Sequence, residues 1–545
     1  MSQNSTPASG LDRWSALALA GSLAILVVAR FRAIVDPAIF GYDESLFLVQ
    51  GMAWAKGLVP GLDTWVNKPP LFEVPFAASY AVFGATPIPL RIAQLLTLLA
   101  CAFVCGRAAR AGRGPLAEVV AAWATALVSS TGLPPGEILP CSSEAFFVLP
   151  LVLAPCFALA RARPDRRPPW VSMLLSGAAL GLATQCRQNA LVLVPIVGAA
   201  VLLNPAFAGP RRRAAAGALF ALGLVGSFAP IVLYLAAKGA LAGAVYWSWT
   251  YPRAIQTFAP GELIGPGLAY LWRATSANVA ILVLCALGVL ALGYDIVTNR
   301  AERTRAGLWL AFLGAGGVMC MLGGRFYGHY FVMLAPALGV VAGAGAAMSA
   351  RRLQSLGPER TRVALSLAGL LFATTSAFAV VREAWLAEHT DWINESREAA
   401  SRGPLLALIR ARTAPDDRIF LLGTCPGLYY RAERAPAAPD LSGELLFGSS
   451  SMGLALKAPA SGGRVLPLDA ILAEGVGKAT LVLDLTSVPA PRRERLSGER
   501  VRWDHVGEGG LERIPLVVRE LEASFERLPG TVEGVVIYRR KAGGS

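Results

Sequence analysis

Residues 40–45, Phe-Gly-Tyr-Asp-Glu-Ser, and residues 67–73, Asn-Lys-Pro-Pro-Leu-Phe-Glu, mark the two ends of one polar loop that separates two strongly apolar stretches. The loop carries an adjacent carboxylate pair, a lysine and a Pro-Pro dipeptide. Charged side chains at a membrane boundary are costly to bury and typically mark a reaction or transport site. The loop therefore indicates a membrane protein and the place of its chemistry.

The composition supports a membrane protein. The 545 residues are 54% hydrophobic and only 16% charged, whereas soluble domains carry about 25% charged residues. The net charge of +14 would suit a nucleic-acid partner, but the arginines gather in short loops between apolar stretches, at 107–113, 161–167, 211–213, 300–305 and 351–362. Such loops stay in the cytoplasm, so we expect no nucleic-acid binding.

A spanning helix needs about 20 apolar residues. This length predicts about 11 spans, near 14–36, 88–106, 115–133, 144–160, 169–186, 189–204, 215–237, 275–297, 306–322, 328–348 and 364–381. With a cytoplasmic N-terminus, this odd number of helices places all the arginine clusters inside and the loop at 37–87 outside. Gly177/Gly181 and Gly339/Gly343 have the spacing of close helix packing.

The composition becomes more charged after Val381. Short apolar runs at 418–423, 479–484 and 535–539 predict buried strands, and residues 514–528 have helical periodicity. We therefore expect two parts: a transmembrane domain at 1–381, with its first extracytoplasmic loop at 37–87, and a soluble extracytoplasmic α/β domain at 382–545.

The acids on the outer side are candidate functional residues. Repulsion between Asp43 and Glu44 raises the pKa of one carboxyl, so that the pair could divide the roles of base and metal ligand; the alternative is a pair that merely solvates the loop. Glu144 begins the fourth span on the same side. It either stabilises that helix N-terminus or completes a metal or acceptor site.

The basic candidates suit an anionic lipid headgroup. Prolines after Lys68 restrict it to an extended conformation, and its fixed ammonium suits a phosphate; the alternative is ordinary placement at the interface. Arg187 and Arg325 lie at outer ends of spans, against the usual distribution of positive charge, and His329 is close to Arg325 in sequence. The aromatic run 246–251 favours an interfacial belt over a sugar platform.

Other chemistry is disfavoured. The sequence has no P-loop, zinc-type H-E-x-x-H or G-x-S-x-G motif, which argues against nucleotide-driven transport and serine hydrolysis. Cys141 and Cys425 would both lie outside, and the sequence leaves open whether they form a disulfide.

Four motifs together resemble glycosyltransferase family 39: Asp43-Glu44 after the first span, Asn-Lys-Pro-Pro-Leu at 67–71, Ser-Ser-Glu-Ala-Phe-Phe at 142–147, and Gly-Arg-Phe-Tyr-Gly-His-Tyr-Phe at 324–331. The resemblance spans roughly residues 38–348, and residues 418–430 resemble a segment of bacterial members. This family includes protein O-mannosyltransferases and lipid A aminoarabinose transferases, and its fold is the GT-C membrane fold. The tail does not resemble the β-trefoil of eukaryotic protein mannosyltransferases, which disfavours a protein acceptor.

The resemblance implies an inverting enzyme of the cell (inner or plasma) membrane. It would move a sugar from a polyprenyl-phosphate donor to a hydroxyl of a lipid, glycan or protein acceptor on the extracytoplasmic face. Asp43 would be the general base, assisted by Glu44, and Glu144 would serve the acceptor or a metal. The donor phosphate would be held by Lys68, Arg187, Arg325 and His329. Some relatives bind a divalent cation, but this sequence offers no decisive ligand set.

Two other interpretations stay open. A transporter or flippase of lipid-linked sugars would place its substrate near the membrane midplane, often between internal repeats, whereas here the polar residues gather at the outer edge and no repeat is evident. Alternatively, residues 382–545 are a carbohydrate- or partner-binding module that governs the choice of acceptor.

Overall fold

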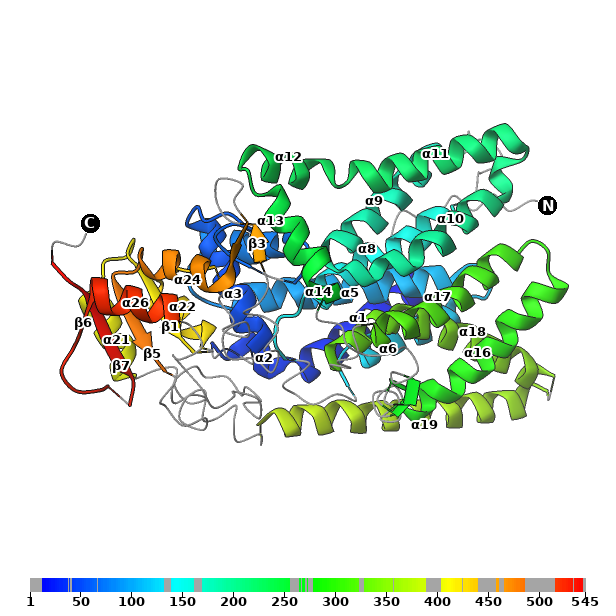
Figure 1. Cartoon of the computed structure of the whole chain (residues 1–545). Helices are drawn as coiled ribbons and strands as arrows, with labels where there is room; N and C mark the ends of the chain where they lie inside the picture. Colours follow the sequence, from blue (N-terminus) through cyan, green and yellow to red (C-terminus); the bar gives the residue numbers. More distant parts are fainter. Residues whose placement is uncertain are drawn as a thin grey trace.

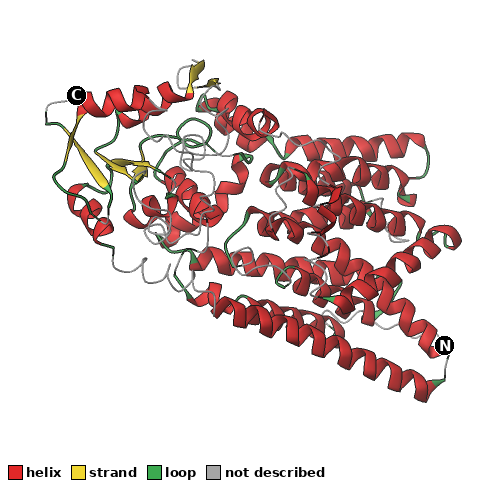
Figure 2. Cartoon of the chain, turned by 60° about the horizontal axis from the view of Figure 1, so that its bottom comes forward, coloured by secondary structure: helices red, strands yellow, loops and turns green. Residues whose placement is uncertain are grey.

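The computed structural model describes residues 12–37, 39, 42–65, 67–131, 139–160, 169–254, 264–265, 267–269, 272, 278–322, 328–355, 357–388, 403–423, 425–439, 457–459, 465–485, 515–532 and 534–542. Long helices that run roughly side by side form one end of the molecule, and a small sheet lies at the other (Figure 1). Figure 2 shows the same division, with the strands gathered near the C-terminus.

The helices of the bundle coincide with the predicted spans. They are α1 (Arg13–Ala29) with α2 (Phe31–Val35), α5 (Ile88–Arg110), α6 (Pro115–Val128), α8 (Ser143–Ala158), α9 (Trp170–Cys186), α10 (Leu193–Leu203), α11 (Pro210–Gly226) with α12 (Ala229–Ala237), α16 (Val279–Thr298), α17 (Arg303–Met321), α18 (Ala335–Gln354) and α19 (Pro358–Glu388). In the described part of the chain, 6 helical stretches are long and apolar enough to cross a membrane, and the remaining predicted spans form shorter apolar helices. The polytopic α-helical class is therefore confirmed.

Both predicted glycine pairs pack helices closely. A side chain at Gly177 would collide with the Phe220 carbonyl oxygen of α11, and a side chain at Gly339 would collide with Thr125 of α6. Residues 335–347 of α18 are all buried. Small residues thus let α18 pack at the centre of the bundle.

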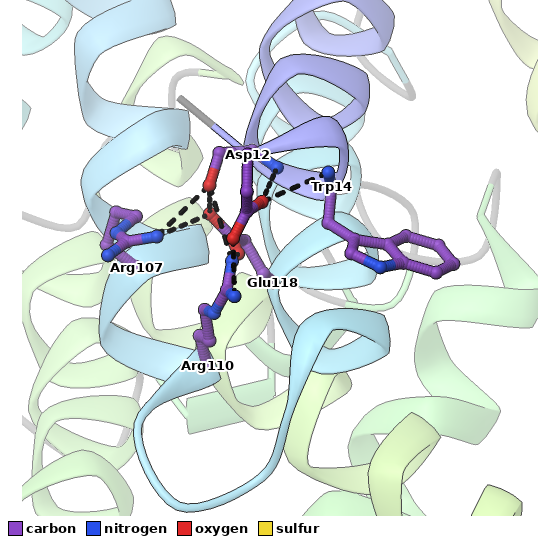
Figure 3. Close-up of polar contacts among 6 residues, drawn as sticks. Asp12, Trp14, Arg107, Arg110 and Glu118 are labelled. Carbon is purple, nitrogen blue, oxygen red and sulfur yellow. Dashed lines mark hydrogen bonds and ion pairs between the residues drawn. The ribbon is translucent and has the colours of Figure 1, made fainter. Parts of the chain in front are cut away.

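A buried carboxylate joins three helices at the arginine-rich end of the bundle (Figure 3). Glu118 of α6 is 0% exposed and pairs with Arg110 of α5 at 2.6 Å. Ser15 of α1 donates a 2.7 Å hydrogen bond to the same carboxylate. Asp12 caps α1 by accepting from the Ser15 amide, and its hydrogen bond with Arg110 holds the pKa of Asp12 well below its ordinary value.

The C-terminal part is a mixed sheet with the strand order β2-β1-β5-β7-β6. Its strands are β1 (Arg418–Leu422), β2 (Ala435–Pro436), β5 (Leu481–Asp484), β6 (Phe525–Arg527) and β7 (Val536–Arg540). β1 pairs in parallel with β2 and β5, and β7 pairs antiparallel to β5 and β6. A separate hairpin joins β3 (Lys457–Pro459) to β4 (Val465–Pro467).

Alternating strand residues face two apolar layers. Ile419 and Leu421 pack with α21 (Pro404–Arg412) and α22 (Pro426–Ala432), and Phe420 and Leu422 pack with α24 (Leu468–Val476) and α26 (Pro515–Ser524). The three predicted strands and the α/β composition are confirmed.

The predicted helix at 514–528 is wrong at its C-terminal end. The helix ends at Ser524, and the following three residues form β6. Phe525 is buried in the layer beside α26, and the backbone of β6 pairs with β7. The pairing of these residues with a distant strand overrides their helical periodicity.

The loop at 37–87 is largely helical and packs against the sheet domain. It contains α3 (Tyr42–Ala55), the short η1 (Pro70–Glu73) and α4 (Val74–Phe83). Phe47 and Phe76 share one hydrophobic cluster with Leu428 and Tyr429 of α22. The Trp65 amide donates to the Pro439 carbonyl at 3.0 Å. The C-terminal part is therefore built onto the loop that carries the acidic pair.

Cys141 and Cys425 are both buried in this shared cluster, but neither forms a disulfide. The possibility that the sequence left open is thus not realised in this structure.

We predict that Glu118→Ala lowers the free energy of unfolding by about 3 kcal/mol, the lower end of the range for a broken buried ion pair, because its partners Arg107 and Arg110 are partly exposed and can turn toward water. Glu526→Ala is the control, since it breaks an ion pair with Arg539 in which both side chains are nearly half exposed; that change is expected to cost less than about 1 kcal/mol. Thermal unfolding in detergent measures both. Equal losses would contradict the structural role of Glu118.

Glu73 predicts a pH dependence. Its side chain is fully buried, neither carboxyl oxygen has a hydrogen-bond partner among the described residues, and burial raises its pKa to about 8. The unfolded chain ionises this group near pH 4.3, whereas the folded state holds the proton up to about pH 8, so the stability falls as the pH rises from about 4.3 to about 8 and then levels off. Relative to the parent protein, Glu73→Gln should therefore raise Tm much more at pH 9 than at pH 5. An equal change at both pH values would exclude this account.

Candidate functional site

Three of the predicted site residues, Asp43, Glu144 and His329, lie close together. His329, in η5 (Gly328–Leu334), places its Nε2 atom 3.5 Å from Asp43 Oδ2 and 4.0 Å from Glu144 Oε1. Asp43 lies in the first turn of α3, and Glu144 in the first turn of α8. The side chain of Asp43 is 37% exposed, whereas that of Glu144 is 0% exposed. Asp43 is therefore the most accessible of these three side chains.

Arg187 neutralises Glu144. It immediately follows α9, and its Nη1 atom forms an ion pair with Glu144 Oε1. Its guanidinium carbon also lies 4.0 Å from the centroid of the Tyr330 ring, and Ser143 donates to the second oxygen of Glu144 at 2.9 Å. Ser142 is the N-cap of α8 but makes no side-chain capping bond. Glu144 thus makes an ion pair and a hydrogen bond in addition to lying at a helix N-terminus.

Lys68 places a cation beside aromatic faces. Its Nζ atom lies 4.1 Å from the centroid of the Phe47 ring and 5.8 Å from that of Phe72. Burial lowers the pKa of the ammonium, and the nearby carboxylates of Glu144 and Asp43 oppose that shift. In the described ranges no carboxylate forms an ion pair with Lys68. Its charge is available to an anion, while the rings limit the directions from which one can approach.

Glu44, which directly follows Asp43, holds a buried ion pair with Arg91. Arg91 of α5 donates to both of its carboxylate oxygens, at 2.8 Å and 2.6 Å. The Cys141 amide donates to Glu44 at 2.9 Å, and Arg91 also donates to the Asp36 carbonyl at 2.6 Å. Glu44 thereby fixes the start of α3 against two neighbouring segments, so a direct contact with an acceptor would require it to leave Arg91.

Sequence reasoning missed Arg91, although a usable signal was present. Arg91 lies at the outer end of a predicted span, against the usual distribution of positive charge, and this was the criterion that selected Arg187. The other predicted basic residue, Arg325, lies outside the described residues.

The predicted interfacial belt is wrong for Trp247. Residues Tyr246–Thr250 form a π-helix, in which Trp247 is 2% exposed. Its ring stacks on Trp65 of the first loop with a centroid distance of 4.3 Å. Trp247 therefore packs against the first loop.

The donor set does not favour a resident metal. In the described part of the chain, no group of three or more His, Cys, Asp and Glu side chains could hold an ion. Glu144 is already neutralised by a guanidinium, so Asp43 and His329 are the two potential donors left in this group.

Comparison with known proteins identifies the fold. Neither a protein-family model nor a curated protein matches the sequence. Among solved structures, ArnT from Cupriavidus metallidurans in the apo state has a TM-score of 0.56 at 14% identity, and 98% of each chain is covered. The same protein bound to undecaprenyl phosphate gives 0.58 at 15% identity, covering 98% of this chain and 99% of that one.

An oligosaccharyltransferase from Archaeoglobus fulgidus, tethered to an acceptor peptide, gives a TM-score of 0.50 at 12% identity, covering 97% of this chain and 74% of that one. At identities this low, the structural similarity establishes the fold and leaves the substrate open. The chain has the GT-C fold of these membrane glycosyltransferases, as the sequence motifs indicated.

Proposed function

We propose that the protein transfers a sugar from a polyprenyl-phosphate carrier to an acceptor hydroxyl at the extracytoplasmic membrane surface. The observation that carries this proposal is an accessible carboxylate, Asp43, beside cationic or protonatable groups at Lys68, Arg187 and His329. The ArnT structure of the same fold holds undecaprenyl phosphate, which supports the same class of carrier here.

In the proposed reaction, Asp43 accepts the proton of the acceptor hydroxyl. The acceptor oxygen bonds to the anomeric carbon while the bond from that carbon to the phosphate oxygen breaks, and the electron pair leaves with the phosphate. Attack opposite the leaving group inverts the anomeric configuration. Lys68, Arg187 and His329 would stabilise the charge that grows on the phosphate, and no step passes through a metal.

Glu144 and Glu44 act indirectly in this proposal. Glu144 would fix the orientation of the Arg187 guanidinium through their ion pair. Glu44 would hold the first turn of α3, and hence Asp43, through Arg91. Arg325 keeps its expected role at the phosphate as a proposal from sequence alone.

Helix α5 supports the proposed side of the membrane. Arg91, near its start, pairs with Glu44 beside the site, and Arg110, at its end, joins the arginine-rich cluster of Figure 3. The 23 residues of α5 span about 34 Å at a rise of roughly 1.5 Å per residue, which suffices for a hydrocarbon core of about 30 Å. If the arginines are cytoplasmic, the site faces outward.

Asp43→Asn should lower the rate of sugar transfer by about 10²–10⁴-fold, the usual contribution of a general base, with no change in protein accumulation or Tm. A transfer assay with purified protein and a polyprenyl-phosphate sugar measures this. Asp416→Asn alters an exposed acid of the C-terminal part and should retain the parent rate. Full activity of Asp43→Asn would remove Asp43 from the base role.

Lys68→Ala should raise the KM for the donor roughly ten- to hundred-fold, because a hydrogen bond to a charged group contributes about 1.5–3 kcal/mol. Lys68→Arg should recover part of the loss, since it keeps the charge but changes its geometry. Steady-state kinetics with varied donor concentration test both variants. An unchanged donor KM in Lys68→Ala would contradict the phosphate contact.

The flippase alternative makes a different prediction in sealed vesicles that contain the purified protein and the lipid-linked sugar. The glycosyltransferase forms a new glycosidic bond and releases the polyprenyl phosphate. Movement of the intact donor across the bilayer without any such bond would favour the flippase.

A further inference from the structure

We propose that Gln188 and Ser248 are positioning residues that hold Lys68 in its phosphate-binding place; this inference rests on the proposed function. Gln188 Nε2 donates to the Asn67 carbonyl at 3.0 Å, and Ser248 Oγ donates to the Lys68 carbonyl at 3.0 Å. The carbonyls of both peptide groups that flank the Lys68 Cα are therefore bonded to side chains from elsewhere in the fold.

The local sequence explains why these donors come from outside. Lys68 and Pro69 each precede a proline, which disfavours the helical conformation at both positions, so this part of the loop does not satisfy its carbonyls by regular helical bonding. Lys68 is 7% exposed, so its buried carbonyl group needs a partner, whereas Asn67 is exposed and its bond with Gln188 adds a second point of attachment. Gln188 and Ser248 supply the two donors, and they also contact each other, because Gln188 Nε2 donates to the Ser248 carbonyl at 2.5 Å.

Gln188 lies in a short segment that links the two cations of the site. Arg187, just before it, pairs with Glu144, and Asn189, just after it, donates to the Met319 carbonyl at 2.9 Å. The break between α9 and α10 thus binds α8, the first loop and α17 through three consecutive side chains. The placement of Lys68 is coupled to that of Arg187 through this segment.

Ser248 is held by aromatic packing. It lies in the π-helix Tyr246–Thr250, and its neighbour Trp247 stacks on Trp65, with 21° between the ring planes. Trp65 belongs to the same loop as Lys68, so the stack and the hydroxyl bond attach the π-helix to the loop at two points. Single-turn π-helices occur frequently at functional sites, and here the turn places a hydroxyl against the Lys68 backbone.

The test uses undecaprenyl phosphate binding to purified protein in detergent, together with the donor KM. Gln188→Ala and Ser248→Ala should each weaken binding and raise the donor KM about five- to tenfold, with Tm within about a degree of the parent value. Ser248→Thr keeps the hydroxyl and should retain most of the affinity. Unchanged binding in both alanine variants would overturn the proposal.

Gln185→Ala is the matched control. Gln185 is another glutamine at the same end of α9; its side chain is buried, whereas that of Gln188 is partly buried, and its amide donates to the Ser227 carbonyl at 3.1 Å, at the end of α11. Its loss should leave donor binding unchanged. A decrease equal to that of Gln188→Ala would mean that general packing at this end of α9, and not the bond to the loop, controls affinity.

A double-mutant cycle separates positioning from packing. If Gln188 acts through Lys68, adding Gln188→Ala to Lys68→Ala should weaken binding no further. Full additivity would overturn the proposal. The outcomes also distinguish the positioning role from the proposed enzymatic function. If donor binding depends on Gln188 but no sugar is transferred, the positioning role is retained and the enzymatic function is contradicted. If sugar is transferred at a rate that does not depend on Gln188, the enzymatic function is retained and the positioning role is contradicted.

Discussion

The buried ion pair between Glu44 and Arg91 is the interaction on which the site and its surroundings depend. Both side chains are almost completely buried, and removing one partner of such a pair typically costs about 3–5 kcal/mol. This pair fixes the start of α3 beside α5 and beside the segment that leads into α8. The first turn of α3 places Asp43, and the rest of α3 packs against α22 of the C-terminal part.

The charged groups at the end of the bundle beside the first loop fall into two classes according to their partners. Glu44 and Glu144 are buried against arginines, and these ion pairs fix helix ends. Asp43 is partly exposed and lies beside His329, and Lys68 rests over aromatic rings. In the proposed reaction Asp43 takes the proton and Lys68 binds the phosphate, and neither is held by an ion pair as close as those of Glu44 and Glu144.

Much of the bundle could be predicted from sequence, because hydropathy over about 20 residues reflects the thickness of the membrane. Contacts between distant segments could not. The helical loop packs against the sheet through single apolar residues such as Phe47 and Leu428, which leave no local pattern, and β6 interrupts a helical periodicity by pairing with β7. Charge drew attention to Lys68 and Arg187, but a neutral glutamine such as Gln188 gives no comparable signal.

The anomeric configuration of the product tests the central claim most directly. Purified protein would be incubated with a polyprenyl-phosphate sugar of known configuration and an extract of envelope lipids and glycans, and the linkage of the product determined by NMR. We expect an inverted linkage and one polyprenyl phosphate released for each sugar transferred. A retained configuration would contradict direct attack by a hydroxyl that Asp43 deprotonates.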